Sequence, residues 1–316
     1  MKVLVTGYTG FLGSALVREL QGAGACLCLA GRMAVGSMAR GVSYHLIRDL
    51  NRNTDWYPAL EGVDSVVHLA ARVHQFDIDN EAAYWEANVH GTIQLARQAA
   101  KAGVRRFVFL STIKVNGDFT DAGFPFRAHD NAFPEGDYAR SKYEAECRLL
   151  ELASETGLEV AIIRPALVYG SGAKGNLLHL MNWIVSGRPL PFGAIENRRT
   201  LCSLRNLCSL IIICLSHPKA VNKIFLAGDG VSVSTPELIE CIGNSLGRTP
   251  LLISVPSTVL RWSLVLVGRQ EIWTRLGLSL ELDIRENLKI LGWTPAQSIT
   301  DGIQEMASGF AASRLR

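Results

Sequence analysis

The sequence predicts an α/β protein, with a doubly wound parallel sheet followed by a smaller C-terminal α/β lobe. Two observations predict it. Short, almost continuously apolar runs alternate with longer amphipathic runs through the first two thirds of the 316 residues, and a glycine-rich turn joins the first two runs. Strands that helices cover on both faces are apolar throughout. Strand alternating with helix therefore favours a parallel sheet between two helical layers.

The elements follow from these runs in order. Buried strands are predicted at 3–6, 26–30, 43–47, 65–69, 107–110 and 160–164, and helices at 11–21, 54–60, 81–102 and 138–156. After about residue 170, Gly, Pro and Asn punctuate the chain more often. Helices are predicted there at 174–186, 235–246, 257–268 and 298–310, with a strand at 223–227. We expect a dinucleotide-binding domain at 1–170 that takes sheet elements from about 220–230, and an interleaved substrate lobe at 171–316.

Composition narrows the classes of function. Hydrophobic residues make up 48% and charged residues 19%, which supports a large core. A net charge of +3 with scattered basic residues gives no indication of a nucleic-acid partner. The seven cysteines include no C-x-x-C pair and the seven histidines form no ligand cluster, so we expect no metal site. Free thiols and the lack of a targeting segment before the first strand predict a cytoplasmic protein.

The two most apolar runs lie at 210–215 and 259–267. Both are shorter than the roughly 18–20 residues that cross a bilayer, and Arg261 interrupts the second, so no transmembrane segment is predicted. We expect both runs to be buried helices. Peripheral contact with a membrane surface is the alternative.

The turn T-G-Y-T-G-F-L-G at 6–13 follows a strand and opens a helix, which is the context of the Rossmann dinucleotide fingerprint. Gly7 makes the tight turn, Gly10 admits the pyrophosphate, and Gly13 lets the helix pack closely on the sheet. Free N–H groups at the helix start then face the phosphates. The intervening residues of the expected cofactor site are Tyr8, Thr9, Phe11 and Leu12.

Arg32 follows the second strand, where an NAD-preferring site usually places a carboxylate for the ribose hydroxyls. A guanidinium suits a 2′-phosphate, so the sequence favours NADP(H), with NAD(H) as the alternative. Asp49 and Leu50 follow the third strand. The Asp49 carboxylate is expected either to accept a hydrogen bond from the adenine amino group or to cap a helix.

Tyr138 and Lys142 stand four residues apart on a predicted helix, and therefore on one face. A nearby ammonium should lower the pKa of the phenol, an oxidised nicotinamide ring would add positive charge, and the phenol could then act as an acid or base. Hydroxyls at Ser111 and Thr112 follow a central strand, at the edge of the sheet where ligands bind. Thr112 is expected to orient a substrate carbonyl towards Tyr138, with Ser111 as the competing candidate.

With these motifs the chain resembles an extended short-chain dehydrogenase/reductase of the nucleotide-sugar epimerase/dehydratase family, to which UDP-glucose 4-epimerase belongs. The resemblance covers nearly the whole chain. Its motifs occur in the family's order: TGYTGFLG (6–13), DL (49–50), HLAA (68–71), NVHGT (88–92), STIKVNG (111–117), YARSK (138–142), RPALVYG (164–170) and LGWTP (291–295).

The resemblance implies a role for each matching position. Thr112, Tyr138 and Lys142 match the catalytic hydroxyl, tyrosine and lysine. The strand end that packs on the cofactor matches Leu69, Ala70 and Ala71, and Pro165 falls near the nicotinamide. Asn176 and Leu177 match a pair that approaches uracil, and Arg199 matches an arginine that binds the diphosphate.

Two departures bear on the substrate. The segment S-T-I-K-V-N-G carries Lys114 and Asn116 where many members read S-S-x-x-V-Y-G, and Lys114 joins the expected substrate contacts. Leu167 replaces an asparagine that touches substrate phosphate in many members. The segment, with A-x-V-H at 71–74, resembles the branch that reduces 4-keto sugars made from UDP-N-acetylglucosamine for bacterial surface polysaccharides such as O-antigen.

Three functions follow. The first is an NAD(P)H-dependent reductase of a UDP-4-keto-6-deoxy-N-acetyl amino sugar at carbon 4, because Arg32 suits an exchangeable cofactor. The second is a UDP-sugar 4-epimerase that retains NAD. The third is a non-catalytic dinucleotide-sensing protein on the same fold. A dehydratase is disfavoured, because Ile113 and Lys114 stand where the family places an Asp-Glu pair. By analogy with related enzymes, the helices at 81–102 and 138–156 predict a homodimer.

Overall fold

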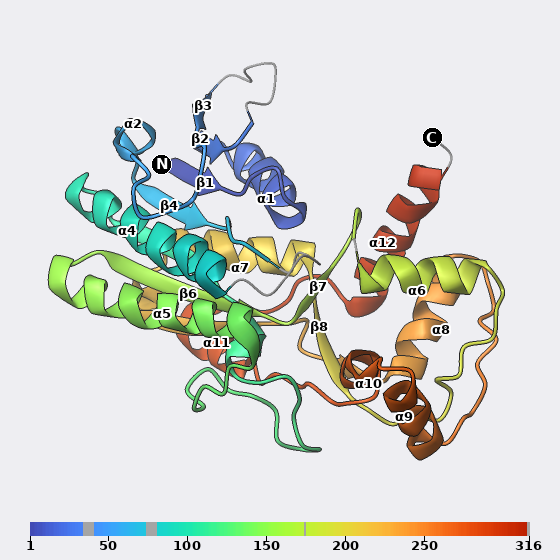
Figure 1. Cartoon of the computed structure of the whole chain (residues 1–316). Coiled ribbons are helices and arrows are strands. Elements are labelled where there is room, and N and C mark those ends of the chain that lie inside the picture. The colour runs from blue at the N-terminus through green and yellow to red at the C-terminus, as the bar shows by residue number, and fades with distance from the viewer. Residues whose placement is uncertain (34–40, 74–80, 174, 315–316) are drawn as a thin grey trace.

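A computed structural model describes residues 1–33, 41–73, 81–173 and 175–314 of the chain. Its centre is a seven-stranded, wholly parallel sheet that twists through the molecule (Figure 1). The strands follow in space as β3 (Val42–Leu46), β2 (Cys26–Gly31), β1 (Lys2–Thr6), β4 (Ser65–His68), β5 (Arg106–Leu110), β6 (Glu159–Pro165) and β9 (Lys223–Ala227). The predicted doubly wound α/β class is confirmed.

Alternating side chains of the strands feed two core layers. Val3 and Val5 of β1 face the layer formed with α1 (Phe11–Gly22) and α7 (Leu204–Ser216), whereas Leu4 faces the opposite layer. That second layer is formed with α2 (Tyr57–Leu60), α4 (Thr92–Lys101) and α5 (Gly136–Thr156). Both faces of the sheet are thus covered, which explains the continuous apolar runs of its strands.

The helix expected at 81–102 contains a π-helical segment. Its parts are α3 (Glu81–Tyr84), the π-helix Trp85–Gly91 and α4. π-helical turns inside α-helices often occur at functional sites. This one contains Asn88, whose side chain is buried. Sequence periodicity gave no sign of the extra residue, because a one-residue bulge hardly changes the apolar pattern.

A second, three-stranded sheet was not predicted. It has the order β10 (Ser232–Val233), β8 (Arg199–Ser203) and β7 (Leu167–Tyr169). These strands are too short to show a period in the sequence. Around them lie α6 (Asn176–Val185), α8 (Thr235–Ser245), α9 (Ser257–Leu266), α10 (Gln270–Leu276) and α12 (Ile299–Arg314). The remaining elements are α11 (Arg285–Leu291), beside β9, and short 3₁₀ turns at Ile113–Val115 and Pro218–Ala220.

Two expectations about individual segments were wrong. The helix expected at 54–60 begins only at Tyr57 and is preceded by Trp56, so Asp49 is not its N-cap. The run 210–215 is buried in α7 as expected, but most of the run 259–267, in α9 and just beyond it, is exposed. His74 of the A-x-V-H segment lies outside the described residues. Across those described ranges, no helix has both the length and the apolar character to cross a bilayer.

Candidate active site

The glycine turn has the geometry of an anion cradle. Gly7 has a φ of +70°, and a Cβ there would lie 2.8 Å from the backbone nitrogen of Ala70. A Cβ on Gly13 would lie 2.2 Å from the Gly7 carbonyl oxygen, so only glycine lets α1 start this close to the turn. Gly10 precedes α1 and no side chain caps the helix. The first N–H groups of α1 therefore fit dinucleotide phosphates.

Tyr8 is buried in this turn, although it was expected at the cofactor. Its hydroxyl donates to the carbonyl of Met33, and its ring lies 6.0 Å from that of Tyr44. The Tyr8 side chain therefore fastens the turn to the end of β2. Any contact it makes with a dinucleotide would come from its backbone.

The neighbouring strand ends carry the other expected cofactor residues. Arg32 is exposed at the carboxyl end of β2. Asp49 is exposed beyond β3, and its carbonyl accepts a hydrogen bond from the Thr54 hydroxyl at 2.7 Å. Leu50 packs so closely on the π-helix that a Cβ on Gly91 would lie 2.8 Å from its Cγ. Parallel strands bring all of these positions to one edge of the sheet.

A buried histidine fixes the end of β4 beneath this edge. His68 lies within hydrogen-bond distance of Thr6 (Nδ1 to Oγ1, 2.8 Å) and of Thr92 (Nε2 to Oγ1, 3.0 Å). Burial, reinforced by the charge of Lys142, lowers the pKa of His68 to about 3, so the ring stays neutral. The Thr6 hydroxyl also accepts the N–H of Ala70 at 3.2 Å. The segment Leu69–Ala71, partly buried, is thereby held against the glycine turn.

Asn88 connects that segment to α5. Its amide oxygen accepts the backbone N–H of Arg72 at 2.7 Å, and its amide nitrogen donates to the Arg72 carbonyl at 3.0 Å and to the Ser141 hydroxyl at 3.0 Å. Ser141 lies between the two functional residues of Y-A-R-S-K. The π-helix thus anchors the helix that carries Tyr138 and Lys142 to the strand end beside the cofactor cradle.

The two candidate hydroxyls occupy different environments. Thr112 is partly exposed after β5, and its oxygen accepts the N–H of Lys114 at 3.3 Å, which leaves its own proton available. Ser111 is 3% exposed, and its hydroxyl has no hydrogen-bond partner among the described residues. A substrate carbonyl therefore has access to Thr112, whereas Ser111 faces the interior.

Tyr138 and Lys142 lie one turn apart near the start of α5. Lys142 is 2% exposed, with its ammonium 3.9 Å from the centre of the Phe109 ring on β5. Burial lowers the pKa of Lys142 to about 7, and the Glu146 carboxylate opposes part of that shift. The ring of Tyr138 meets that of Tyr84 edge-on at 6.3 Å.

The lowering of the tyrosine pKa was expected from Lys142 and an oxidised nicotinamide ring together, and the chain alone does not show it. Burial, and then Tyr84, raise the pKa of Tyr138 to about 12. Desolvation of the phenolate is the larger cause of this shift, and Lys142 is itself desolvated and close to half-charged at neutral pH. In the chain alone, Tyr138 is a protonated phenol at neutral pH.

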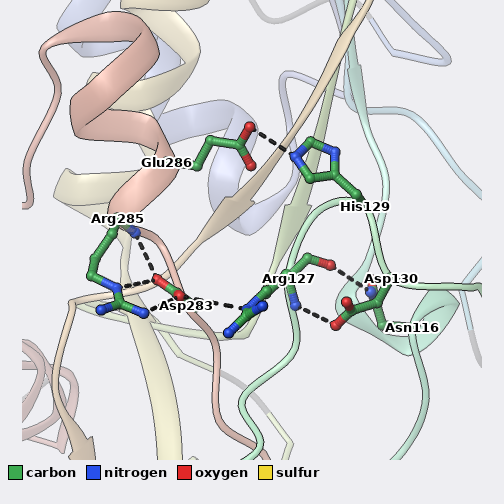
Figure 2. A network of polar contacts seen from close by, with 7 residues as sticks. All are labelled: Asn116, Arg127, His129, Asp130, Asp283, Arg285 and Glu286. Atoms are coloured by element: carbon green, nitrogen blue, oxygen red, sulfur yellow. Dashed lines mark hydrogen bonds and ion pairs between the residues drawn. The ribbon is translucent and has the colours of Figure 1, made fainter.

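The Asn116 departure has a structural reason. Its amide oxygen accepts from Nη1 of the buried Arg164 at 2.9 Å, and its amide nitrogen donates to the Arg127 carbonyl at 3.1 Å. The Arg127 N–H in turn donates to Asp130 at 2.7 Å (Figure 2). The asparagine thus holds both Arg164 and the loop that follows Thr112.

The same loop is fastened to the C-terminal part of the chain. Figure 2 shows Arg127 beside Asp283, which Arg285 also binds at 2.6 Å, and His129 beside Glu286 at 2.8 Å. Backbone bonds join Phe126 to both Glu281 and Asp283 at 2.8 Å. The loop between β5 and α5 is therefore ordered by residues more than 150 positions away.

Two residues that were expected to bind the substrate lie near one carboxylate, that of Asp118. Lys114 Nζ lies 2.9 Å from Asp118, whose charge also acts on Arg199. Burial lowers the pKa of Arg199 to about 10, and Asp118 opposes this shift. Arg199 already donates to the carbonyls of Thr274 and Leu278 at 3.2 and 2.8 Å, which leaves part of its guanidinium for a ligand.

A cavity of about 630 Å³ adjoins this cluster and is lined by residues 119–122, 194–197, 256–258 and 277–279, with Trp273. Of the other expected contacts, Asn176 is exposed at the start of α6, whereas the Leu177 side chain is buried in the core of the second lobe. Leu177 can therefore reach a ligand only through its backbone. Pro165 is buried at the end of β6, and Leu167 is 46% exposed.

Comparison with known proteins places this site in a family. The NAD dependent epimerase/dehydratase family matches residues 3–228. The chain belongs to this family. It is 40% identical to a UDP-glucose 4-epimerase of Vibrio cholerae, over 99% of this chain and 97% of that protein. It is 28% identical to the N-acetyl-α-D-glucosaminyl-diphospho-ditrans,octacis-undecaprenol 4-epimerase of Escherichia coli O157:H7, over 66% and 61% of the two chains.

A solved structure shares the whole fold. MoeE5, in complex with UDP-glucuronic acid and NAD, superposes with a TM-score of 0.79 at 23% identity and covers 99% of this chain and 100% of its own. The resemblance to the epimerase/dehydratase family is thus confirmed, and the protein is an enzyme of an NAD-dependent family. Membership of the 4-keto-sugar reductase branch and a preference for NADP(H) have no support from these relatives.

Three functional positions of this epimerase/dehydratase chain were missed. His68, Asn88 and Ser141 had no assigned role, although they lie inside the motifs H-L-A-A, N-V-H-G-T and Y-A-R-S-K. Each is a buried polar residue within an apolar pattern, and such residues need partners. The sequence therefore showed that these three residues need partners. It did not show which partners, because they come from segments more than 15 positions apart. Where the structure describes the chain, no cluster of His, Cys, Asp and Glu is placed to hold a metal ion.

Proposed function

We propose that this family member is a reductase of a 4-keto nucleotide sugar, and that it exchanges its dinucleotide at each turnover. The observation that carries this proposal is the end of β2, where Gly31 and the exposed Arg32 stand and no carboxylate grips the ribose hydroxyls. An enzyme that retains its cofactor needs such a carboxylate, as an acceptor for the ribose hydroxyls, more than one that exchanges its cofactor. Arg32 also supports a preference for NADP(H), because a guanidinium pairs with a 2′-phosphate.

The protonation states support the direction of reduction. A bound reduced nicotinamide dinucleotide supplies the hydride for carbon 4. Tyr138 donates its proton to the oxygen that was the ketone, and a pKa of about 12 ensures that it holds this proton at neutral pH. The Thr112 hydroxyl donates a hydrogen bond to the same oxygen. Lys142, one turn beyond Tyr138 on α5, would bind the nicotinamide ribose. Its protonated ammonium would supply a positive charge at the site.

The substrate class follows from the cluster around Asp118. Lys114 and Arg199 contribute two positive charges against one carboxylate, beside a cavity that has room for a sugar or a base. A sugar diphosphate suits this arrangement. We infer a UDP-linked 4-keto-6-deoxy-N-acetyl amino sugar, with Asn176 and the Leu177 backbone at the uracil. Its product would be a precursor of bacterial surface polysaccharide such as O-antigen.

A UDP-sugar 4-epimerase is the second candidate, and the 40% identical Vibrio cholerae protein favours it. An epimerase oxidises and reduces carbon 4 in one turnover, so it must hold NAD throughout and Tyr138 must first act as a base. The distinguishing feature is therefore whether the dinucleotide leaves.

The test is to incubate the purified protein with a UDP-4-keto-6-deoxy-N-acetylglucosamine and NADPH or NADH, then identify the product by NMR. Stoichiometric loss of absorbance at the reduced nicotinamide band, with one carbon-4 alcohol formed, supports the reductase. The reductase is overturned if the protein interconverts UDP-N-acetylglucosamine and its galacto epimer without added cofactor and releases NAD only on denaturation. Equal or better use of NADH would remove the NADP(H) preference alone.

Two further properties belong to this proposal. The seven cysteines are all free, which suits a reducing compartment such as the cytoplasm. A homodimer through α4 and α5 follows from the family analogy, and Tyr143 offers a half-exposed aromatic on that surface. Sedimentation of a monomer at micromolar concentration would contradict the homodimer.

A further inference from the structure

Helix α9 presents apolar side chains on two opposite faces. Leu260 is buried and Leu264 partly buried, and both pack into the second-lobe core. Val259, Trp262 and Leu266 are 57%, 68% and 85% exposed. At 3.6 residues per turn, these three fall on one face, opposite Leu260 and Leu264. A helix that is apolar all round is normally buried on all sides.

The sequence around this outer face is predominantly basic, and the nearby Glu271 is paired with Arg275 at 2.9 Å. From residue 241 to residue 270 the sequence has no Asp, Glu or Lys, but it has Arg248, Arg261 and Arg269. All three arginines are exposed. Val267, 66% exposed, extends the apolar surface directly beyond the helix. We call Val259, Trp262, Leu266 and Val267 the α9 face; Arg261 lies on the flank of the helix between this face and the packed one, and Arg269 follows the helix.

We propose that the α9 face docks on the surface of an anionic lipid bilayer. Its composition is that of an interfacial helix, with Trp and aliphatic side chains to enter the headgroup boundary and adjacent arginines to meet anionic lipids. This inference is independent of the proposed reaction. It goes beyond that reaction by placing the enzyme at a membrane while it acts on its substrate.

The charge pattern favours a bilayer over a second copy of the chain. A twofold interface brings the same patch of two subunits together, so it would set the arginines beside one α9 face against those beside the other. Residues 241–270 contain no carboxylate, and Glu271, which follows them, is already paired with Arg275 at 2.9 Å. An anionic lipid surface is complementary to the same charges.

The position of α9 permits such contact. Figure 1 shows α9 at the outer end of the second lobe, away from the seven-stranded sheet and from α4 and α5. The cavity beside Arg199 is also lined by Pro256, Ser257 and Thr258, at the beginning of α9. A docked α9 therefore leaves the glycine turn free and holds the cavity close to the headgroups.

The test is flotation of the full-length protein with two kinds of vesicle, pure phosphatidylcholine and phosphatidylcholine mixed with phosphatidylglycerol. We expect the protein to float with the anionic vesicles and to be released by salt. Changing Trp262→Ser together with Leu266→Ser should lower the partition coefficient by at least about tenfold. Changing Arg261→Gln or Arg269→Gln should lower it about fivefold each, as about 1 kcal/mol per cation predicts.

The matched control is Phe124→Ser with Leu288→Ser, which removes side chains that are 77% and 54% exposed elsewhere. This variant should float like the wild type. Because all these side chains are exposed, thermal melting should confirm that each variant folds. Failure of the wild type to float, or unchanged flotation of the Trp262/Leu266 variant, overturns the proposal. The proposal is also overturned if the wild type is a dimer that does not bind vesicles and the Trp262/Leu266 variant is a monomer. The α9 face would then join two chains.

Discussion

Arg164 of β6 and Glu146 of α5 form an ion pair of 2.5 Å, with 3% and 2% of their side chains exposed. The pair lies one helical turn beyond Lys142, whose pKa the Glu146 charge helps to raise. Asn116 completes it from the segment that follows Thr112. One buried ion pair therefore connects Asn116, which departs from the family pattern, with Lys142, the lysine of the candidate site.

Changing Glu146→Gln should destabilise the fold and shift the pH dependence of activity. It leaves the buried Arg164 without a counter-charge, which typically costs roughly 3–5 kcal/mol. It also removes the charge that holds the pKa of Lys142 up, so that pKa falls further below about 7. Lys142 then loses its proton at a lower pH. The fall in rate on the alkaline side of the profile should therefore begin at a lower pH.

The control for that prediction is Glu144→Gln on the same helix. Glu144 pairs with Arg148 at 2.7 Å, but both side chains are largely exposed, so the loss should be under about 1 kcal/mol. Denaturant melts give the stabilities, and initial rates across pH give the profile. An unmoved alkaline limb in Glu146→Gln, with the fold retained, would show that the pair has no influence on Lys142.

Changing Tyr138→Phe should reduce kcat by roughly 10²–10⁴ with dinucleotide affinity retained, because it removes the proton donor and little volume. Dinucleotide binding by fluorescence and steady-state rates separate the two effects. Tyr143→Phe, on the outer side of the same helix, is the control and should keep the wild-type rate. Nearly unaltered turnover in Tyr138→Phe would exclude the proposed acid.

The structure also shows why part of this site was predictable. The glycine turn, the strand ends and the Y-A-R-S-K spacing are local signals, and they located Gly7, Thr112 and Tyr138 on the expected elements. The raised pKa of Tyr138 in the chain alone was not predicted, because its causes, burial of the phenol and then the electrostatic effect of Tyr84 from a distant segment, leave no sign in the Y-A-R-S-K spacing. Sequence spacing reports which groups are near, and not how much water remains around them.

The second lobe was harder to predict for the same reason. Its strands β7, β8 and β10 have two to five residues and pair across long separations, so they show no period. The exposed face of α9 was misjudged, because an apolar run carries no information on whether the fold provides a partner. Long, strongly patterned elements such as α5 and β6 were found close to their observed bounds.

Mutation can distinguish the roles of the Thr112 and Ser111 hydroxyls, which both follow β5. Thr112→Val keeps shape and removes the hydroxyl, so we expect kcat to fall by roughly ten- to a thousandfold. Ser111→Ala should leave kcat near the wild-type value and should not lower stability, because the Ser111 hydroxyl has no partner among the described residues to lose. Rates and thermal melts of both variants decide between them. The reverse ranking would make Ser111 the functional hydroxyl.

His68 should make the fold sensitive to acid. Its pKa is lowered from 6.5 to about 3 in the folded chain, so below pH 6.5 the unfolded chain takes up a proton that the folded chain refuses. The free energy of unfolding should therefore fall as pH falls from about 6.5 towards 3, by up to about 1.4 kcal/mol per pH unit from this group. His68→Asn should flatten that slope.

Urea melts at a series of pH values measure this slope for each protein. Since His68→Asn also removes contacts with Thr6 and Thr92, its stability at pH 7 is expected to be lower. The difference in slope, and not the difference at one pH, tests the buried neutral ring.

Two glycines of α1 give opposite expectations for the same substitution. Gly13→Ala places a Cβ 2.2 Å from the Gly7 carbonyl oxygen, so the turn must move away from the helix. Dinucleotide affinity should fall at least about tenfold, since the N–H groups at the start of α1 lose their alignment. Gly22→Ala meets nothing within 4 Å and should stabilise the helix by up to about 1 kcal/mol with affinity unchanged. Equilibrium dinucleotide binding and thermal melts of both variants provide the measurement. Wild-type affinity in Gly13→Ala would mean that the phosphates bind elsewhere than at this turn.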